Sequence, residues 1–472
     1  MTNRPRLYDG KGPWPQPNPQ RPDAEAPIVL GIPDEEVADW NRHIGARYAV
    51  QLFGGIPAAI RDAIRYRIDR YPTDAEFDTM MTTGVYSKFL TPLSGDPDEA
   101  PFASIIASAP AGTTFSKIDL TAIRSVKPYE DMYTAPTLSL VAEVGTTRTI
   151  RAILIGDDLV LEPSDRNAFD LAKLFVMQGA AYGILFTEHP NLHFPFDSIN
   201  AITQTFLPID HLVFKLLRPH LRFQLPLNRA VLESKGSVIT NFKYTFYAPF
   251  TADMDDGMLD FFSAGYVGVP GRSAYPKYDF SARPKRIPSD YGVFLERYYD
   301  TVLAFTSKVV AHLPSHDVDL VRAWANHCSD NVPGFPSEHE ILAQGVLERT
   351  LARIVWDLSV GHGADHQVFS KEISPEQKFL RLRVPPPASK SIARVDPATA
   401  TKFRDRFKAR LAHRVFFEPS LITALIDTDY EFTSPDLVAA QNEFKQNLRE
   451  TEAQLPCRNY MPLSEIPASI QY

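Results

Sequence analysis

Hydrophobic positions in the first part of the chain recur at helical spacing. Between Asp34 and Met81, Ile60, Ile64 and Ile68 follow one another every four positions, with Arg and Asp between them. This periodicity predicts helices that bury one face. Longer helical runs are predicted further along the chain, over residues 165–188, 200–217, 289–312, 338–366, 401–413 and 435–454.

The pattern changes between residues 137 and 161, where short apolar runs are joined by glycine turns at Gly145 and Gly156. Runs of this length between glycines are typical of two or three short strands. The sequence therefore predicts a mainly α fold with a small β element around residues 137–161.

Domain organisation follows from the prolines and from the absence of linkers. Residues 1–27 contain seven prolines, which disfavour both helix and sheet, so an extended arm is expected there. No polar linker divides the remainder into two core-sized blocks. We therefore predict a single domain over residues 28–472.

Composition narrows the class of protein. The 472 residues are 44% hydrophobic and carry a net charge of −8 without any run of Lys and Arg, so a soluble globular protein is expected and nucleic acid is not an expected partner. No window holds 18 consecutive apolar residues, and the N-terminus is polar and proline-rich, so we expect neither a transmembrane span nor a classical signal peptide. Cys328 and Cys457 form no metal or disulfide pattern, so a reducing compartment, the cytoplasm, is expected.

Histidine pairs are the clearest candidates for chemistry. Twelve histidines placed at random would give roughly 0.3 pairs at i,i+4 spacing, yet the chain has three: His189/His193, His312/His316 and His362/His366. On a helix this spacing brings two imidazoles to one face, where they can share a metal ion. The competing interpretation is that these are surface histidines or satisfied core histidines.

The surroundings of the pairs differ. The pair His362/His366 follows an apolar stretch, and Gly361 and Gly363 are expected to leave space for a metal. The pair His189/His193 ends another apolar run. Pro190 lies between these two histidines and must distort the helix.

The third pair, His312/His316, encloses Pro314 and is predicted to be an external loop. Two buried pairs would supply four neutral nitrogen donors, which suit a transition metal better than Mg²⁺ or Ca²⁺.

Three sequence segments resemble the lipoxygenase family. His211-Leu-Val-Phe-Lys-Leu-Leu-Arg-Pro-His220 is similar to its HPIxKLLxPH stretch, and Ile354-Val-Trp356 followed by His362 and His366 resembles its second metal helix. The final residues, Ile466 to Tyr472, resemble the family's IPxSIxI terminus. The matched segments span residues 135–472.

The resemblance implies a metal site and a reaction. By position it implies His189, His193, His362, His366 and the α-carboxylate of Tyr472 as ligands of a non-heme iron, with manganese as a possible substitute. It also implies a dioxygenase in which hydroxide on the metal takes a hydrogen from a polyunsaturated fatty acid, O₂ then adds, and a hydroperoxide forms. No separate acid or base is assigned. The lipid-binding β-barrel common in the family is not expected, because the sequence before residue 137 is predicted to be helical.

A long apolar substrate pocket is predicted near the metal, since bulky apolar residues lie on or near the first ligand helix. The candidate substrate-binding residues are Phe175, Ile184, Phe186, Phe206 and Leu207.

Two alternative functions stay open. Glutamines that many lipoxygenases place around the iron fall here on Leu185 and Phe369, so a non-lipid small molecule oxidised on the same fold is the first alternative. The second is a non-catalytic helical binding protein whose histidines are structural. Metal content distinguishes the non-catalytic binding protein from the two enzymes. Oxygen uptake with fatty acids distinguishes the fatty-acid dioxygenase from the enzyme that oxidises a non-lipid molecule.

Overall fold

The computed structural model describes residues 32–95, 97–193, 195–233, 248–251, 261, 279–366, 380–455 and 461–471. The predicted arm over residues 1–27 and the predicted ligand Tyr472 therefore lie outside the described residues. The division into an arm and one domain stays a prediction.

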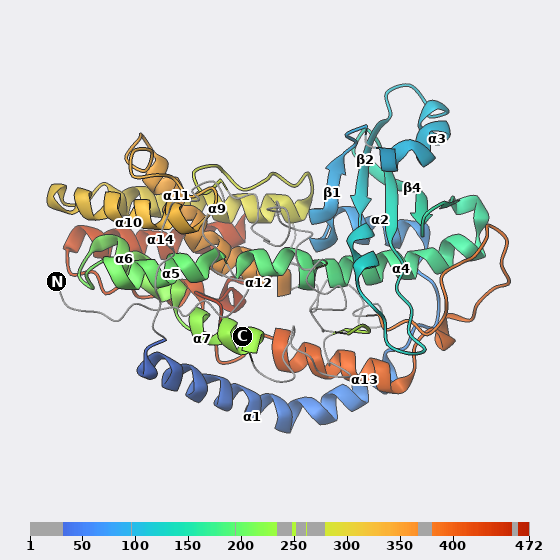
Figure 1. Ribbon diagram of the computed structural model, residues 1–472, viewed down its shortest axis with the longest axis horizontal. Coiled ribbons are helices and arrows are strands. Elements are labelled where there is room, and N and C mark those ends of the chain that lie inside the picture. The colour runs from blue at the N-terminus through green and yellow to red at the C-terminus, as the bar shows by residue number, and fades with distance from the viewer. Residues whose placement is uncertain are drawn as a thin grey trace.

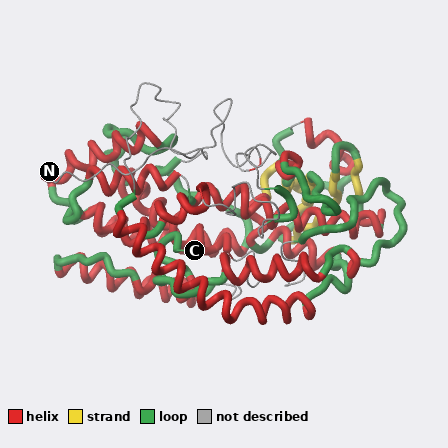
Figure 2. The backbone as a smooth tube through the Cα atoms, turned by 60° about the horizontal axis from the view of Figure 1, so that its bottom comes forward, coloured by secondary structure: helices red, strands yellow, loops and turns green. Residues whose placement is uncertain are grey.

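Helices dominate the described chain and confirm the predicted mainly α fold (Figures 1 and 2). The α-helices are α1 (Asp34–Arg65), α2 (Asp74–Thr82), α3 (Ala103–Ala107), α4 (Asn167–Gly183), α5 (Pro195–Phe206), α6 (Leu212–Leu221), α7 (Gln224–Glu233), α9 (Asp290–Val310), α10 (Val318–Asn331), α11 (Val346–Trp356), α12 (His362–His366), α13 (Phe403–Ala412) and α14 (Pro435–Ala453). Three π-helices directly follow α4, α11 and α13, over Ile184–Glu188, Asp357–Gly361 and His413–Phe417.

Two of the predicted helices were placed wrongly. The run predicted over 200–217 is broken between α5 and α6, because Pro208 disfavours helical geometry in the residue before it. The run predicted over 338–366 begins only at Val346, after Gly345 with a φ of +72°. Helices α7 and α10 were not predicted, and α10 ends in buried Asn331.

The sheet has five antiparallel strands in chain order, at the upper right of Figure 1. Its strands are β1 (Leu90–Pro92), β2 (Thr114–Asp119), β3 (Thr137–Val144), β4 (Thr147–Ile155) and β5 (Leu159–Leu161). Strands β3 to β5 confirm the predicted element, and Gly145 and Gly156 adopt the left-handed conformation in its turns. Strands β1 and β2 correct the expectation that the chain before residue 137 is helical.

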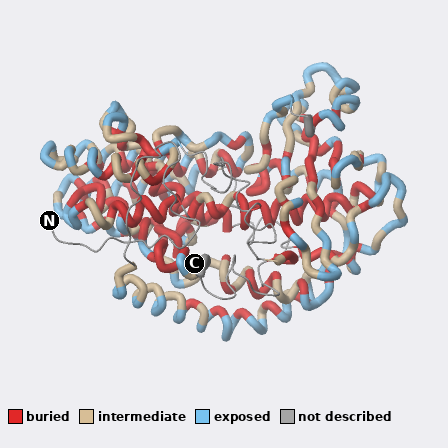
Figure 3. The backbone as a smooth tube through the Cα atoms, viewed as in Figure 1, coloured by how far each residue is buried: buried red, intermediate tan, exposed pale blue. Residues whose placement is uncertain are grey.

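Helix α4 runs through the middle of the molecule and is buried almost throughout (Figure 3). Its small residues let neighbours approach: a Cβ at Gly183 would lie 2.8 Å from Cζ of Phe89, and one at Gly179 would lie 3.2 Å from Cβ of Leu120. The stretch Asn167–Phe206 is long and apolar enough to cross a membrane, but 94% of its most apolar window is buried inside the fold, as in a core helix.

Helix α1 lies along the lower edge of Figure 1 and packs on α13 and the π-helix after it. The face that it buries is mostly small, with Gly55, Ala59 and Ala63 four residues apart. The isoleucines that predicted the buried face are largely outside, since Ile60 is 41% and Ile64 is 65% exposed. The helix was predicted correctly, but its buried face was not.

Candidate metal centre

The first histidine pair follows a break in helical geometry. In the π-helix Ile184–Glu188, hydrogen bonds reach one residue further than in an α-helix, and the N–H of His189 donates to the carbonyl of Ile184. A 3₁₀ turn over His189–Leu192 follows, in which Pro190 has no N–H to leave unsatisfied. The expected distortion is present, and it turns both His189 and His193 into the core.

The second pair also follows a π-helix, Asp357–Gly361, and lies on α12. Here the reason expected for Gly363 was wrong. A Cβ at Gly363 would lie 2.8 Å from Cδ of Pro467 and 3.0 Å from Sδ of Met461, so this glycine admits the C-terminal segment rather than leaving room for a metal.

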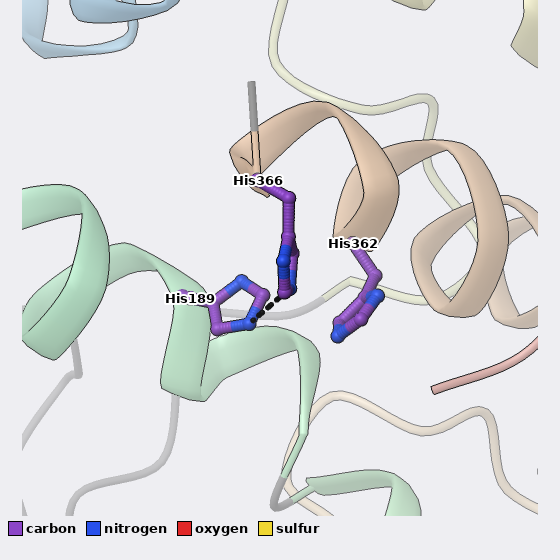
Figure 4. Close-up of side chains that lie close together, drawn as sticks. All are labelled: His189, His362 and His366. Carbon is purple, nitrogen blue, oxygen red and sulfur yellow. Dashed lines mark hydrogen bonds between the residues drawn. The ribbon is translucent and has the colours of Figure 1, made fainter. Parts of the chain in front are cut away.

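The rings of His193, His362 and His366 pack around His189 between these two segments, with ring centres 4.6, 4.7 and 4.8 Å from it. Nε2 of His189 lies 3.0 Å from Nε2 of His193 and 3.2 Å from Nε2 of His366. The ring of His362 is centred 4.7 Å from that of His189 and 4.9 Å from that of His193. Figure 4 shows His362 and His366 on α12 facing His189 across the gap.

The hydrogen-bond network around His193 determines which of its nitrogens carries the hydrogen. The carboxylate of Asp197 can only accept, so the amide nitrogen of Asn228 donates to it at 2.6 Å. The amide oxygen of Asn228 then faces Nδ1 of His193 at 2.9 Å and accepts its hydrogen. Nε2 of His193 therefore presents a bare lone pair to the cluster.

Burial keeps these rings neutral. It lowers the pKa of His193 to about 4, although the hydrogen bond with Asn228 raises it. Burial, followed by the charges of neighbouring histidines, lowers the pKa values of His189, His362 and His366 well below the usual range. Neutral imidazole is the form that binds metals.

This arrangement fits a cation. If His189 carries its hydrogen on Nδ1, its bare Nε2 faces the bare Nε2 of His193 at 3.0 Å, so two lone pairs meet in a buried site. A shared metal ion removes this repulsion, and nitrogen donors of this kind suit transition metals. Nitrogens of His189, His362 and His366 all lie within 4.8 Å of one another, which is compatible with a common ion.

The segment that leads to Tyr472 is held deep in the fold. Ile466 and Ile470 are fully buried. His220, the last histidine of the HPIxKLLxPH-like stretch, donates from Nδ1 to the carbonyl of Ala468 at 2.6 Å and contacts the hydroxyl of Tyr430 through Nε2 at 3.0 Å. Thr423 and Gln471 exchange two further hydrogen bonds.

The remaining candidates lie elsewhere. The side chains of His312 and His316 are 38% and 82% exposed, away from the cluster, as predicted for an external loop. The proposed substrate-binding residues lie in or against the core: Phe175, Ile184, Phe186 and Leu207 are buried, and Phe206 stacks on His327. A cavity of about 750 Å³ between the start of α1, α6 and the C-terminal segment is lined by none of the five. Their role in binding a substrate stays a prediction.

Sequence reasoning missed the polar residues that support the histidines. Asn228 and Asp197 hold His193, while Lys88 and Asp365 lie beside His189. Asp365 could have been noticed, because it is a carboxylate between two histidines on an otherwise apolar helix. Lys88 carries no local signal, since it meets Asp365 only through the tertiary fold.

No protein-family model and no curated protein matches the sequence. Among solved structures, coral 8R-lipoxygenase is similar with a TM-score of 0.69 and 18% identity, over 97% of this chain and 79% of that one. A manganese lipoxygenase is similar with a TM-score of 0.69 and 15% identity, over 93% and 91% of the two chains.

The protein has a lipoxygenase-like fold. The manganese lipoxygenase of Gaeumannomyces graminis is similar as well, with a TM-score of 0.66 and 13% identity over 93% of this chain and 91% of that one. Two of these similar structures are described as manganese lipoxygenases. The structural similarity confirms the expectation of a lipoxygenase-like helical domain.

Proposed function

We propose that this protein is a lipoxygenase-like non-heme metal dioxygenase that converts a polyunsaturated fatty acid into a hydroperoxide. The observation that carries the proposal is the convergence of four neutral, buried imidazoles from two π-interrupted helices, with close Nε2 contacts. The similarity to lipoxygenase structures supports it, and one such structure is described as a complex with arachidonate.

His189, His193, His362 and His366 would hold the metal, iron or manganese, with the α-carboxylate of Tyr472 as the proposed fifth ligand. When bound, the metal supplies the one-electron redox chemistry that removes hydrogen from a weak C–H bond. The protein's own groups orient the imidazoles through Asn228 and exclude water, since the cluster is buried.

The overall reaction is balanced without a further reductant. A C–H bond between two alkenes breaks, a C–O bond to O₂ forms, and the hydrogen ends on the hydroperoxide. The substrate itself is the electron donor, and the proposed partners are only the fatty acid and O₂. We also propose the cytoplasm as its location.

The test combines metal content with oxygen uptake. Protein purified without chelator, or reloaded anaerobically with Fe(II) or Mn(II), is expected to hold one metal per chain and to consume O₂ with linoleate or arachidonate while a conjugated diene appears. His362→Ala should lose the metal, whereas the matched exposed variant His312→Ala should keep it. Equal metal content in both variants, or a wild type that cannot be loaded, would contradict the proposal.

One observation favours the alternative of a non-lipid substrate. Phe186 is centred 5.4 Å from Phe250 and 6.0 Å from Phe261, so aromatic rings already fill the region expected to hold an alkyl chain. A fully loaded protein that takes up no O₂ with any polyene, yet does so with another oxidisable small molecule, would establish the alternative.

A further inference from the structure

A buried ion pair lies against one ligand of the metal centre. Nζ of Lys88 is 2.5 Å from Oδ1 of Asp365, and the two side chains are 15% and 0% exposed. The second oxygen of the carboxylate, Oδ2, lies 3.6 Å from Nδ1 of His189. The carboxylate thus stands between a fixed cation and the side of the His189 ring that points away from the cluster.

The fold brings Lys88 to this place through close packing on α4. Lys88 belongs to the 3₁₀ helix Val85–Phe89, whose last residue packs so closely on Gly183 that a Cβ there would lie 2.8 Å from Cζ of Phe89 and would force that ring to shift. The hydroxyl of Ser87 is 2.7 Å from that of Ser289, which ties the same turn to the start of α9. Lys88 is therefore held from two sides and is not a mobile surface lysine.

The nitrogen that faces Asp365 has no other acceptor among the described residues. Nδ1 of His189 is buried and makes no hydrogen bond in the part of the chain that the structure describes. Leaving a buried polar group in this state is unfavourable. At 3.6 Å, a small rotation of the ring is enough to bring Nδ1 within hydrogen-bonding distance of Oδ2.

We propose that Asp365 is a positioning residue for the metal centre: it accepts a hydrogen bond from Nδ1–H of His189, directs the Nε2 lone pair at the metal, and is itself held by Lys88. This inference rests on the proposed metal-binding function. Carboxylates that accept from a ligating imidazole fix its tautomer and raise its basicity. Asp365 accepts from Nδ1–H of His189 as Asn228 accepts from Nδ1–H of His193, but Asp365 is a carboxylate whereas Asn228 is a neutral amide.

The charge has a measurable consequence. A more basic imidazole donates more strongly, and it favours the higher oxidation state of the metal. Loss of such an outer partner typically lowers metal affinity by about 10–100-fold. Asp365→Asn keeps the shape of the side chain but removes the charge, so we expect a loss of Mn(II) affinity in this range and a higher reduction potential of the bound metal.

The experiment must separate positioning from folding, because Asp365→Asn alone leaves Lys88 buried without its counter-ion. The double variant Lys88→Met/Asp365→Asn removes the pair together and keeps the charge balanced. Its matched control is Arg353→Met/Asp357→Asn, which removes the neighbouring buried ion pair, in which Nε of Arg353 lies 2.6 Å from Oδ2 of Asp357. Mn(II) affinity is measured by competition with a chelator, and stability of the metal-free proteins by urea unfolding.

The expected result is that both double variants have comparable stability without metal, while only the Lys88/Asp365 variant loses affinity by about 10–100-fold. Equal affinity in wild type and in the Lys88/Asp365 variant would overturn the inference, and so would an equal loss in both double variants. If wild type binds neither Mn(II) nor Fe(II), it is the proposed function that fails, and this outcome is recognised before any variant is compared.

Discussion

The segments that carry the candidate metal ligands and helix α1 differ in which kinds of side chain they bury. In the turn that follows α4 and its π-helix, and along α12, polar histidines are buried at the centre of the fold. Along α1, large apolar side chains point outward, and Phe53 is 86% exposed while Gly55 is buried. Both regions are mainly helical and contain apolar positions. Figure 3 shows that α4 is buried along most of its length, whereas α1 is largely intermediate or exposed.

The contrast teaches that the neighbour decides which face of a helix is buried. Helix α1 packs on the π-helix after α13, where a Cβ at Gly55 would already be in van der Waals contact, 3.6 Å from Cβ of Arg414. The histidines are buried because they have one another, and the groups behind them, as partners. Hydropathy alone predicts neither outcome.

The largest expected effect comes from the same substitution in both regions. Phe175→Ala in α4 should lower the free energy of unfolding by about 3–5 kcal/mol, because it removes a fully buried ring and leaves a cavity. Phe53→Ala in α1 should change it by no more than about 0.5 kcal/mol, because that ring is exposed. Urea unfolding measures both, and similar losses would erase the contrast.

Metal addition should also act on one region only. An ion that binds the native state at a concentration 100 times its dissociation constant stabilises it by about 2.7 kcal/mol. Hydrogen exchange should therefore slow in residues 184–193 and 357–366 when Mn(II) is added to metal-free protein, and should stay unchanged along α1 below the global unfolding limit. Protection that appears first in α1 would place the ion elsewhere.

Replacing a helical glycine by alanine should change the stability in opposite directions in the two regions, and by a smaller amount. Gly363→Ala should destabilise by about 1–3 kcal/mol, because the added methyl group collides with Pro467 and Met461. Gly54→Ala on α1 meets no atom within 4 Å and should stabilise by about 0.5–1 kcal/mol through better helix propensity. Thermal unfolding of the two variants checks the signs, and a neutral Gly363→Ala would show that the C-terminal segment does not pack as described.

The smallest effect concerns Asp78, a half-buried carboxyl on α2 that accepts from the N–H of Ile150. Burial raises its pKa to about 6. The native state therefore favours the protonated form, and this contribution to stability is full below about pH 4 and is lost as the pH rises through 6. Asp78→Asn keeps the acceptor oxygen and should be more stable than wild type at pH 7 but not at pH 4, by urea unfolding at both values.

What could be predicted from the sequence was whatever depends on near neighbours. The hairpin around Gly145, the helices that became α9 and α14, and the i,i+4 histidine pairs all follow from local spacing. Strands β1 and β2 were missed because three to six residues carry too little alternation. The supports Asn228 and Lys88 were missed because each meets its partner across long sequence separations, which no local pattern records.

The close fit of Gly363 against Pro467 also sets an order of events during synthesis. These two residues lie about one hundred positions apart, so at ribosomal speed roughly 5–20 s pass between them. During that interval both histidine pairs already exist, but the segment that closes over α12 does not. The packing of Gly363 against Pro467 and Met461 can therefore form only after residues 461–471 have been synthesised.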